Sequence, residues 1–170
     1  MTDRERRLLS IIMPAYNENA TIRAMLDDVL AHQVPGIDKE LIIVESNSTD
    51  GTRQAVLEYS GRERVTIVFE EKALGKGHAV RAGLARATGE FILIQDADRE
   101  YDVSDYDALL EPLLRGKTAF VLGSRHSKTA KIRHFADQAL LAAFMNFGHR
   151  FFQTLLNLLY GQRLNDPFTM

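Results

Sequence analysis

A group of carboxylates follows directly on an apolar run in the segment FILIQDADREYD (91–102). Asp96 and Asp98 stand where the run ends, and Glu100 comes two residues later. Crowded carboxylates repel one another and burial raises their pKa values, so a divalent cation is the simplest way to stabilise them. Hard Mg²⁺ or Mn²⁺ takes carboxylate oxygens and commonly substrate phosphates as well. In a turn after a strand, Asp98 and Glu100 can both reach one such ion.

A solvated acidic loop that begins the next helix is the structural alternative for this cluster. We assign that role to Asp102, Asp105 and Asp107, because carboxylates stabilise the first turn of a helix. For Asp96 and Asp98 we favour a functional role, because they lie where the apolar strand stops.

The segment PAYNEN (14–19) places a proline, an aromatic ring and a carboxylate at the exit of another apolar run. The Tyr16 ring can stack on a nucleobase, and the Glu18 carboxylate can accept a hydrogen bond from a base or a ribose. An Asx-type turn that caps the following helix would explain Asn17 and Asn19, but it would not explain Tyr16 or Glu18.

The glycine-rich segment ALGKGHAVRAG (73–83) matches neither of the common phosphate-binding motifs. It lacks the Ser or Thr that follows the lysine of a Walker A loop, and Val80 stands where a dinucleotide fingerprint has its third glycine. It reads as a turn into a helix N-terminus, where Lys76 could lie near a diphosphate. The absence of a Gly-x-Ser-x-Gly segment argues against a serine hydrolase.

These candidate residues need a scaffold, and the chain alternates apolar runs with segments of helical periodicity. The runs are rich in Ile and Val and lack polar alternation, which is typical of strands buried on both faces. The expected strands are 10–16, 40–46, 65–71, 91–97 and 119–124, and the expected helices are 21–33, 50–61, 76–89 and 103–116. Such alternation predicts a doubly wound α/β sheet, which binds ligands beyond the carboxyl ends of its strands. The polar clusters at 14–18, 45–48 and 96–98 would converge there.

Bulk composition narrows the function classes. The chain has 170 residues, a size that suits one domain or most of one, and its net charge of −2 gives no reason to expect a nucleic-acid partner. It has no cysteine, no apolar signal segment at its start and no uninterrupted apolar stretch of membrane-spanning length. We therefore expect a cytoplasmic protein, at the cytoplasmic face of a membrane if its substrate is a lipid.

Taken together, these segments resemble a family 2 glycosyltransferase, and more narrowly the polyprenyl-phosphate sugar synthases of the dolichol-phosphate mannose synthase type. The matching pieces occur in the order and spacing of that family, between residues 9 and 126: SIIMPAYNE, LIIVESNSTDGT, GKGHAVRAGLARATGEFILIQDAD and VLGSRH. The resemblance implies a GT-A type three-layer α/β sandwich with a mostly parallel sheet. It further implies a catalytic domain over 1–170 that is incomplete at its C-terminus, because NDPFTM (165–170) resembles a motif that more of the domain normally follows.

Residue roles follow from the resemblance position by position. Pro14, Tyr16 and Glu18 would hold the nucleoside, and Asp96, Ala97 and Asp98 would form the Asp-x-Asp motif. Within that motif Asp96 would contact the nucleotide, while Asp98 would bind Mg²⁺ or Mn²⁺ at the diphosphate, with Glu100 as a second metal ligand. Lys76 would be a further contact to the nucleotide sugar. Arg125 would meet phosphate on the donor or the acceptor, and Arg133 is a second cation for an acceptor phosphate.

The chain departs from the family after its second expected strand. The family usually has two Asp residues there, of which the second reads the base, whereas this chain has Glu45 and Ser46. Either Glu45 reaches further and replaces that contact, or the contact is lost. The sequence does not choose between a GDP-linked and a UDP-linked donor.

The resemblance implies metal-dependent, inverting transfer of a sugar from a nucleoside-diphosphate sugar to an acceptor, which we expect to be a polyprenyl phosphate. The segment 135–161 fits that acceptor as an amphipathic helix at a membrane surface, although core packing explains its five phenylalanines equally well. The alternatives are a family 2 enzyme that glycosylates a saccharide hydroxyl, and a non-catalytic nucleotide-binding remnant.

Overall fold

The computed structural model describes residues 7–123, 148, 151–155, 157–159 and 161. The chain divides into two compact units, Met1–Asp107 and Ala108–Met170. Each unit is considered by itself, and the first contains the sheet and the residues predicted to bind the nucleotide and the metal.

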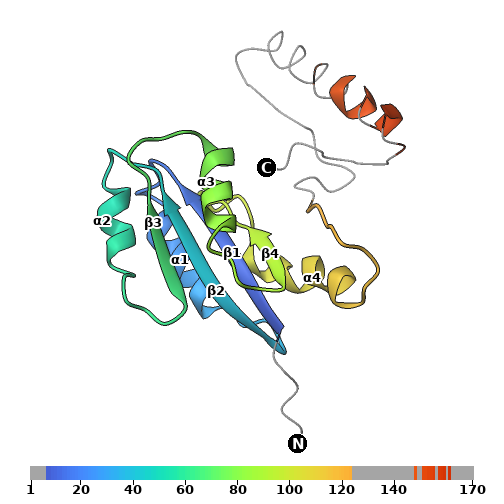
Figure 1. Cartoon of the computed structure of the whole chain (residues 1–170), viewed down its shortest axis with the longest axis horizontal. Coiled ribbons are helices and arrows are strands. Elements are labelled where there is room, and N and C mark those ends of the chain that lie inside the picture. The colour runs from blue at the N-terminus through green and yellow to red at the C-terminus, as the bar shows by residue number, and fades with distance from the viewer. Residues whose placement is uncertain (1–6, 124–147, 149–150, 156, 160, 162–170) are drawn as a thin grey trace, which may run out of the picture. The chain divides into compact units, whose positions relative to one another are not determined.

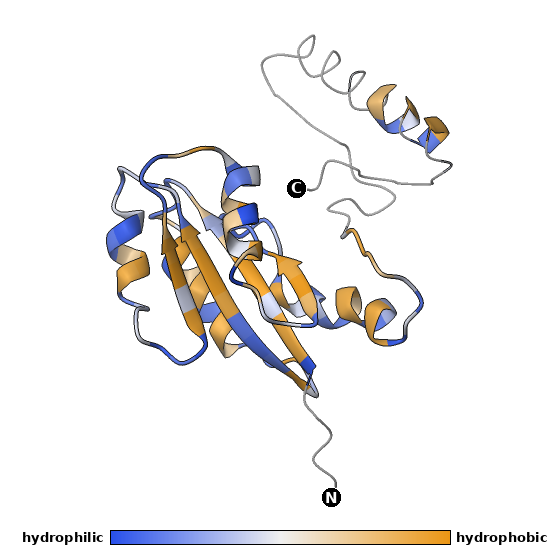
Figure 2. Cartoon of the chain, in the orientation of Figure 1, coloured by the Kyte–Doolittle hydropathy of each residue, from blue (hydrophilic) through white to orange (hydrophobic). Residues whose placement is uncertain are grey.

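The first unit is built on a sheet of four parallel strands, which confirms the predicted fold class (Figure 1). The strands are β1 (Arg7–Ala15), β2 (Ile37–Glu45), β3 (Val65–Phe69) and β4 (Phe91–Ile94), in the spatial order β3-β2-β1-β4. Register places Ile12 of β1 between Ile42 of β2 and Ile94 of β4. Figure 2 shows β2 changing from hydrophilic in its first half to hydrophobic in its second half.

The helices between the strands cover both faces of the sheet. They are α1 (Ile22–Ala31), α2 (Thr52–Leu57) and α3 (Lys76–Leu84), followed by the 3₁₀ turn η1 (Val103–Asp105) and by α4 (Tyr106–Leu114), which crosses into the second unit. On one face, Ala79 of α3 packs into a fully buried cluster with Ile12, Ile42 and Val44. Right-handed crossovers put α1 and α2 on the other face, where they contact each other (Figure 1).

The close packing of α3 on β1 depends on a missing side chain at Gly83. A Cβ atom added there would overlap Cγ2 of Ile12. We expect Gly83→Ala to lower the free energy of unfolding by about 1–3 kcal/mol, the usual cost of overpacking a core. Gly77→Ala in the same helix is the matched control, because its Cβ would meet only Arg81 Nη1 at 3.7 Å. Urea unfolding of both variants measures the difference, and equal stabilities would contradict this packing.

The carboxylate of Glu40 on β2 links strand β1 to the segment that precedes β4. Glu40 Oε1 accepts hydrogen bonds from Ser10 Oγ at 2.5 Å and from the Thr88 backbone N–H at 2.7 Å. Burial would raise the pKa of Glu40, but the hydrogen bonds from Ser10, Thr88 and Gly89 outweigh it and hold that pKa below its ordinary value of 4.5. A lowered pKa in the folded state means that this carboxylate stabilises the fold above the unfolded-state pKa and loses that effect as the pH falls through the folded-state pKa.

Glu40→Gln should therefore destabilise the protein at neutral pH and not in acid. We expect a loss of about 1 kcal/mol at pH 7, below the roughly 1.5–3 kcal/mol of hydrogen bonds to charged groups, because Glu40 is only partly buried. The difference from wild type should shrink as the pH falls below about 4.5. Denaturant unfolding at several pH values checks this, with Glu63→Gln at an exposed position as control. A pH-independent difference would contradict the role of the charge.

The second unit differs from the expectation in one respect. The predicted fifth strand at 119–124 is wrong over its described part, because residues 119–123 form no strand. Thr118 accounts for this locally: its Oγ1 accepts from the Phe120 N–H at 3.2 Å and donates to the Phe120 carbonyl at 2.9 Å. Both backbone groups that a strand ladder would need at Phe120 are thus taken by one side chain.

The predicted amphipathic segment 135–161 lies mostly outside the described residues. Residues 148, 151–155 and 157–159 are helical, and Phe151 packs edge-on against Phe152 with ring centroids 5.5 Å apart. Within the part of the chain that the structure describes, no helix has the length and apolar character needed to cross a bilayer.

Candidate functional site

The order of the strands marks one edge of the sheet as the place for a ligand. From β1 the chain adds β2 and then β3 on one side, and it returns to add β4 on the other side of β1. In an open parallel sheet, ligands bind beyond the carboxyl ends of the strands where this reversal occurs. The segments 14–18 and 96–98, which leave β1 and β4, meet at that point.

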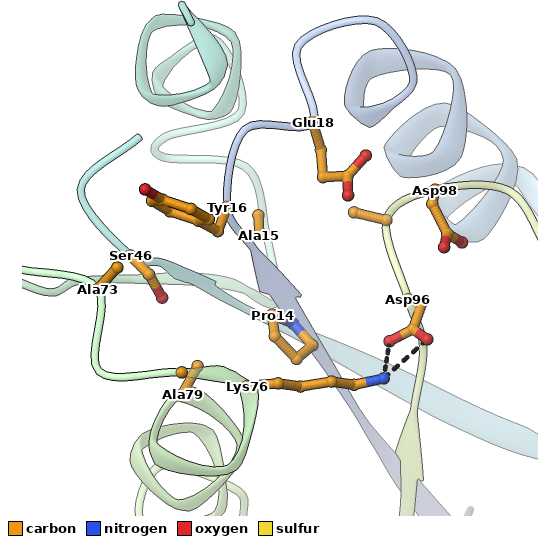
Figure 3. Close-up of a pocket in the computed structure, with 12 residues that line it drawn as sticks. Pro14, Ala15, Tyr16, Glu18, Ser46, Ala73, Lys76, Ala79, Asp96 and Asp98 are labelled. Carbon is orange, nitrogen blue, oxygen red and sulfur yellow. Dashed lines mark hydrogen bonds and ion pairs between the residues drawn. The ribbon is translucent and has the colours of Figure 1, made fainter. Parts of the chain in front are cut away.

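A pocket of about 350 Å³ lies there (Figure 3). Its walls include eight of the residues that the sequence predicted for the site: Pro14, Tyr16, Glu18, Ser46, Lys76, Asp96, Ala97 and Asp98. The remaining wall is formed by small or apolar groups that sequence reasoning did not single out, namely Ala15, Ala73, Gly75 and Ala79. Absence of bulky side chains at these positions leaves the space open.

Left-handed backbone turns the chain sharply after three of the pocket residues. Asn17, Asn47 and Arg99, which follow Tyr16, Ser46 and Asp98 in the sequence, have φ angles of 57°, 55° and 65°. Asn adopts this region more readily than most residues, whereas for Arg99 it is uncommon. Arg99 is held by an ion pair to Asp28 at 3.2 Å. Each of these turns lies directly after a pocket residue, in the loop that follows a strand.

Hydrogen bonds join the loop after β1 to the loop after β2 and so fix the position of Tyr16. Asn17 accepts from the Thr49 N–H at 2.9 Å, and its own N–H donates to Ser48 Oγ at 3.0 Å. The next residue continues the pattern, with the Glu18 N–H donating to Thr52 Oγ1 at 2.8 Å. Asn17 therefore links the two loops, and the residue at the N-cap of α1 is Thr21.

The two ends of the pocket differ in chemistry. Figure 3 shows the Tyr16 ring on the side of Ser46 and Ala73, while Asp96, Asp98 and the end of the Lys76 side chain lie on the other side. Tyr16 is half exposed, so a face of its ring is available to a planar ligand. One end thus suits an aromatic base, and the other end suits phosphate groups and a cation.

Asp96 and Asp98 have different partners at the charged end. Lys76 Nζ lies 2.6 Å from Asp96 Oδ1 and 2.8 Å from Oδ2 (Figure 3). Asp98 instead accepts the Glu100 backbone N–H at 3.0 Å through Oδ1. Lys76 thus already balances Asp96. The other pocket carboxylates are Glu18 and Asp98, and Asp98 is the one that leaves the same strand as Asp96, where a divalent cation would neutralise it.

The residues fit a metal ion that binds together with a phosphate ligand. Among the described residues, no three His, Cys, Asp or Glu side chains come together as a ready-made metal site. Mg²⁺ is commonly held by only one or two carboxylates and completes its shell with water and substrate phosphates. A pocket wall with Asp98 next to open space meets that requirement. The Glu100 side chain does not form part of the wall, and the structure shows its backbone supporting Asp98.

Glu45 lies at the carboxyl end of β2, as the sequence predicts, but outside the pocket wall. Its side chain is fully buried and does not border the pocket. Arg53 Nε contacts its Oε2 at 2.5 Å, and the Ser48 N–H donates to its Oε1 at 2.6 Å. A buried carboxylate needs such partners, and Arg53 and the loop after β2 supply them. Glu45 therefore holds that loop in place from outside the pocket wall, and its direct contact with a nucleotide stays a prediction.

Sequence reasoning missed a polar network beside the pocket. Glu70, which follows β3, accepts from Ser46 Oγ at 2.6 Å and lies 2.5 Å from His78 Nδ1 of α3. The signal was present, because Glu70 is the polar residue that ends the third apolar run at the same edge of the sheet. Arg125 and Arg133, predicted to meet phosphate, lie outside the described residues.

Comparison with known proteins bears on the fold and the family. A dolichyl-phosphate beta-glucosyltransferase of Trichomonas vaginalis is 30% identical over 158 residues, which is 86% of this chain and 46% of that protein. A dolichyl-phosphate beta-glucosyltransferase of Drosophila melanogaster is 39% identical over 110 residues, which is 59% of this chain and 34% of that protein. The chain thus spans less than half the length of either relative.

A solved structure shares the fold. It is glucosyl-3-phosphoglycerate synthase from Mycobacterium tuberculosis in complex with Mn²⁺, UDP-glucose and phosphoglyceric acid, with a TM-score of 0.52 and 29% identity over 65% of this chain and 41% of that one. Residues 10–167 match the family described as Glycosyl transferase family 2, and the chain belongs to that family.

Proposed function

We propose that the protein transfers a hexose from a nucleoside-diphosphate sugar to a polyprenyl phosphate with the help of a divalent metal ion. The observation that carries this proposal is the pocket with an aromatic end and a carboxylate end, at the point where the strand order reverses. Support for the acceptor comes from the two relatives, both named as dolichyl-phosphate glucosyltransferases.

The pocket residues divide the donor between them. Tyr16 stacks on the base, with Pro14, Glu18 and Ser46 around the nucleoside, while Asp96 and Ala97 contact the nucleotide further along the pocket. Lys76 lies beside the diphosphate. Asp98 would hold Mg²⁺ or Mn²⁺, with Glu100 as second ligand. A metal in this place is supported by the Mn²⁺ in the complex of the structural neighbour.

The reaction is a single displacement at the anomeric carbon, so it inverts the configuration there. An acceptor phosphate oxygen forms a bond to that carbon, and the bond to the leaving diphosphate oxygen breaks with its electron pair. A bound divalent cation would offset the charge on the leaving group. A phosphate acceptor is already anionic near neutral pH, so this chain need not supply a general base. Arg125 and Arg133 are the cations that we assign to that phosphate.

The nature of the acceptor determines where the protein acts, and it distinguishes the proposed function from the two alternative functions. A polyprenyl chain would keep the reaction at a membrane surface, and the cytoplasmic face stays a prediction. Transfer to a saccharide hydroxyl would need a carboxylate base to take the proton. A remnant that only binds the nucleotide would need neither an acceptor nor a carboxylate base.

Transfer of radiolabelled sugar tests the proposal. The protein is incubated with UDP-glucose or GDP-mannose, Mn²⁺ and a short polyprenyl phosphate, and the organic extract is counted with and without EDTA. Metal-dependent label in the organic phase is expected. Label transferred only to saccharide acceptors would overturn the lipid acceptor, and metal-dependent donor binding without any transfer would overturn transfer by this chain.

A further inference from the structure

The carboxylate that the family usually carries at position 46 has a counterpart in Glu70, directly after strand β3. Here Ser46 occupies that position and borders the pocket. Its hydroxyl group donates a hydrogen bond of 2.6 Å to Glu70 Oε2. The negative charge therefore lies on Glu70, directly after β3, and Ser46 stands between this carboxylate and the pocket.

Glu70 is held firmly in this position. Its side chain is only 7% exposed, and its second oxygen, Oε1, lies 2.5 Å from His78 Nδ1. Its backbone is fixed as well, because the Glu70 N–H donates to the Glu45 carbonyl at 2.9 Å and the Glu70 carbonyl accepts from Arg53 Nη2 at 3.0 Å. The ion pair between partly exposed Arg53 and buried Glu45 thus supports the carboxylate behind Ser46.

This arrangement sets the direction of the Ser46 hydroxyl group. A carboxylate can only accept hydrogen bonds, so the single hydroxyl proton of Ser46 is committed to Glu70. The lone pairs of Ser46 Oγ are then what the residue offers to the pocket. An amide or alcohol in the place of Glu70 could donate instead and would let the hydroxyl proton turn toward the ligand.

We propose that Glu70 is a positioning residue that makes Ser46 Oγ a hydrogen-bond acceptor for an N–H group of the donor's nucleobase. The inference rests on the proposed function, because it assigns the base end of the same pocket. It selects uracil and guanine, which present a ring N–H donor, over cytosine and adenine, whose corresponding ring nitrogen is an acceptor. Two facing acceptors would leave both groups unpaired inside the pocket.

Binding of four nucleotides tests this assignment. Titration calorimetry in the presence of Mn²⁺ gives Kd values for UDP, GDP, CDP and ADP, and the readout is the ratio between the N–H bases and the acceptor bases. Wild type should prefer UDP or GDP, and Glu70→Gln should reduce that preference about tenfold, the effect of one hydrogen bond to a correctly oriented acceptor. Glu71→Gln, an exposed neighbour with the same change of charge, should leave the preference unchanged.

A swap of the carboxylate separates recognition from structural support. In the double variant Ser46→Asp with Glu70→Gln, the carboxylate returns to the pocket wall and the Gln amide can donate to it, so the preference should recover. If Glu70→Gln does not fold, as judged by its melting temperature, Ser46→Ala supplies the same loss of preference with the carboxylate in place.

The outcomes distinguish the two proposals. A wild type that binds all four nucleotides equally, or a Glu70→Gln variant that weakens all four by one factor, would overturn the role of Glu70 and leave the proposed function standing. A wild type that binds none of them in Mn²⁺ would overturn both.

Discussion

Asp98→Asn is expected to abolish the Mn²⁺-dependent part of nucleoside diphosphate binding and to leave the melting temperature close to that of wild type. We expect affinity for UDP or GDP in Mn²⁺ to fall about a hundredfold, or about 2.8 kcal/mol. In EDTA the variant and the wild type should bind equally weakly. Titration calorimetry with and without Mn²⁺ measures the effect.

The size of this effect follows from how the charged end of the pocket is built. Lys76 already balances Asp96, so Asp98 is the carboxylate after β4 on which a divalent cation would depend. Because the described residues contain no preformed cluster of metal ligands, Mn²⁺ by itself should bind weakly and should bind well only together with a diphosphate. Removing the charge of Asp98 therefore removes metal and diphosphate together.

The unchanged stability has a separate cause. The contact of Asp98 Oδ1 with the Glu100 N–H at 3.0 Å can be made equally by the amide oxygen of an asparagine. Asp105→Asn is the matched control, because Asp105 is exposed, carries the same charge and lies outside the pocket wall. An Asp98→Asn variant that keeps its Mn²⁺-dependent affinity would show that the metal lies elsewhere, and Glu100→Gln would then be the next variant to measure.

The fold could be predicted from the sequence because its strands are buried on both faces. The apolar runs give Leu9, Ile11, Ile12 and Met13 on β1 no exposed surface at all, and such continuous burial leaves an unbroken hydrophobic signal. Strand ends were less predictable. The fourth strand stops at Ile94, short of the expected residue 97, because Asp96 and Asp98 turn into the pocket. At 119–123 the prediction of a strand is wrong altogether, because an apolar run forms a strand only where a neighbouring strand pairs with it.

The site was predictable where a residue's place in the chain determines its place in space. Residues at the carboxyl ends of β1 and β4 converge by topology alone, which is why Tyr16, Asp96 and Asp98 share one pocket. Side-chain direction is another matter. Glu45 and Ser46 are adjacent at the end of β2 and face opposite ways, so that Glu45 meets Arg53 while Ser46 meets the pocket and Glu70. The packing of Arg53, eight residues after Glu45, and of Glu70, 24 residues after Ser46, decides between them.

Tyr16→Ala should weaken nucleotide binding by a route that does not depend on the metal. Stacking of a base on an aromatic ring contributes about 1–3 kcal/mol, so we expect affinity for UDP and GDP to fall about thirtyfold, both in Mn²⁺ and in EDTA. Tyr16→Phe keeps the ring and should bind as wild type does. Stability should change little, because the Tyr16 side chain is half exposed.

Binding of inorganic pyrophosphate tests the phosphate end of the pocket separately from the base end. Pyrophosphate has phosphates and no base, so in Mn²⁺ it should bind Tyr16→Ala and wild type equally, whereas Asp98→Asn should lose it. The hydrogen bonds from the Thr49 N–H to Asn17 Oδ1 and from the Glu18 N–H to Thr52 Oγ1 do not involve the Tyr16 side chain, so truncation at Tyr16 leaves the loop itself intact. Equal weakening of pyrophosphate and UDP by Tyr16→Ala would mean that the ring only supports the loop. Unchanged UDP binding would mean that the base lies elsewhere, and the division of this pocket into a base end and a phosphate end would be wrong.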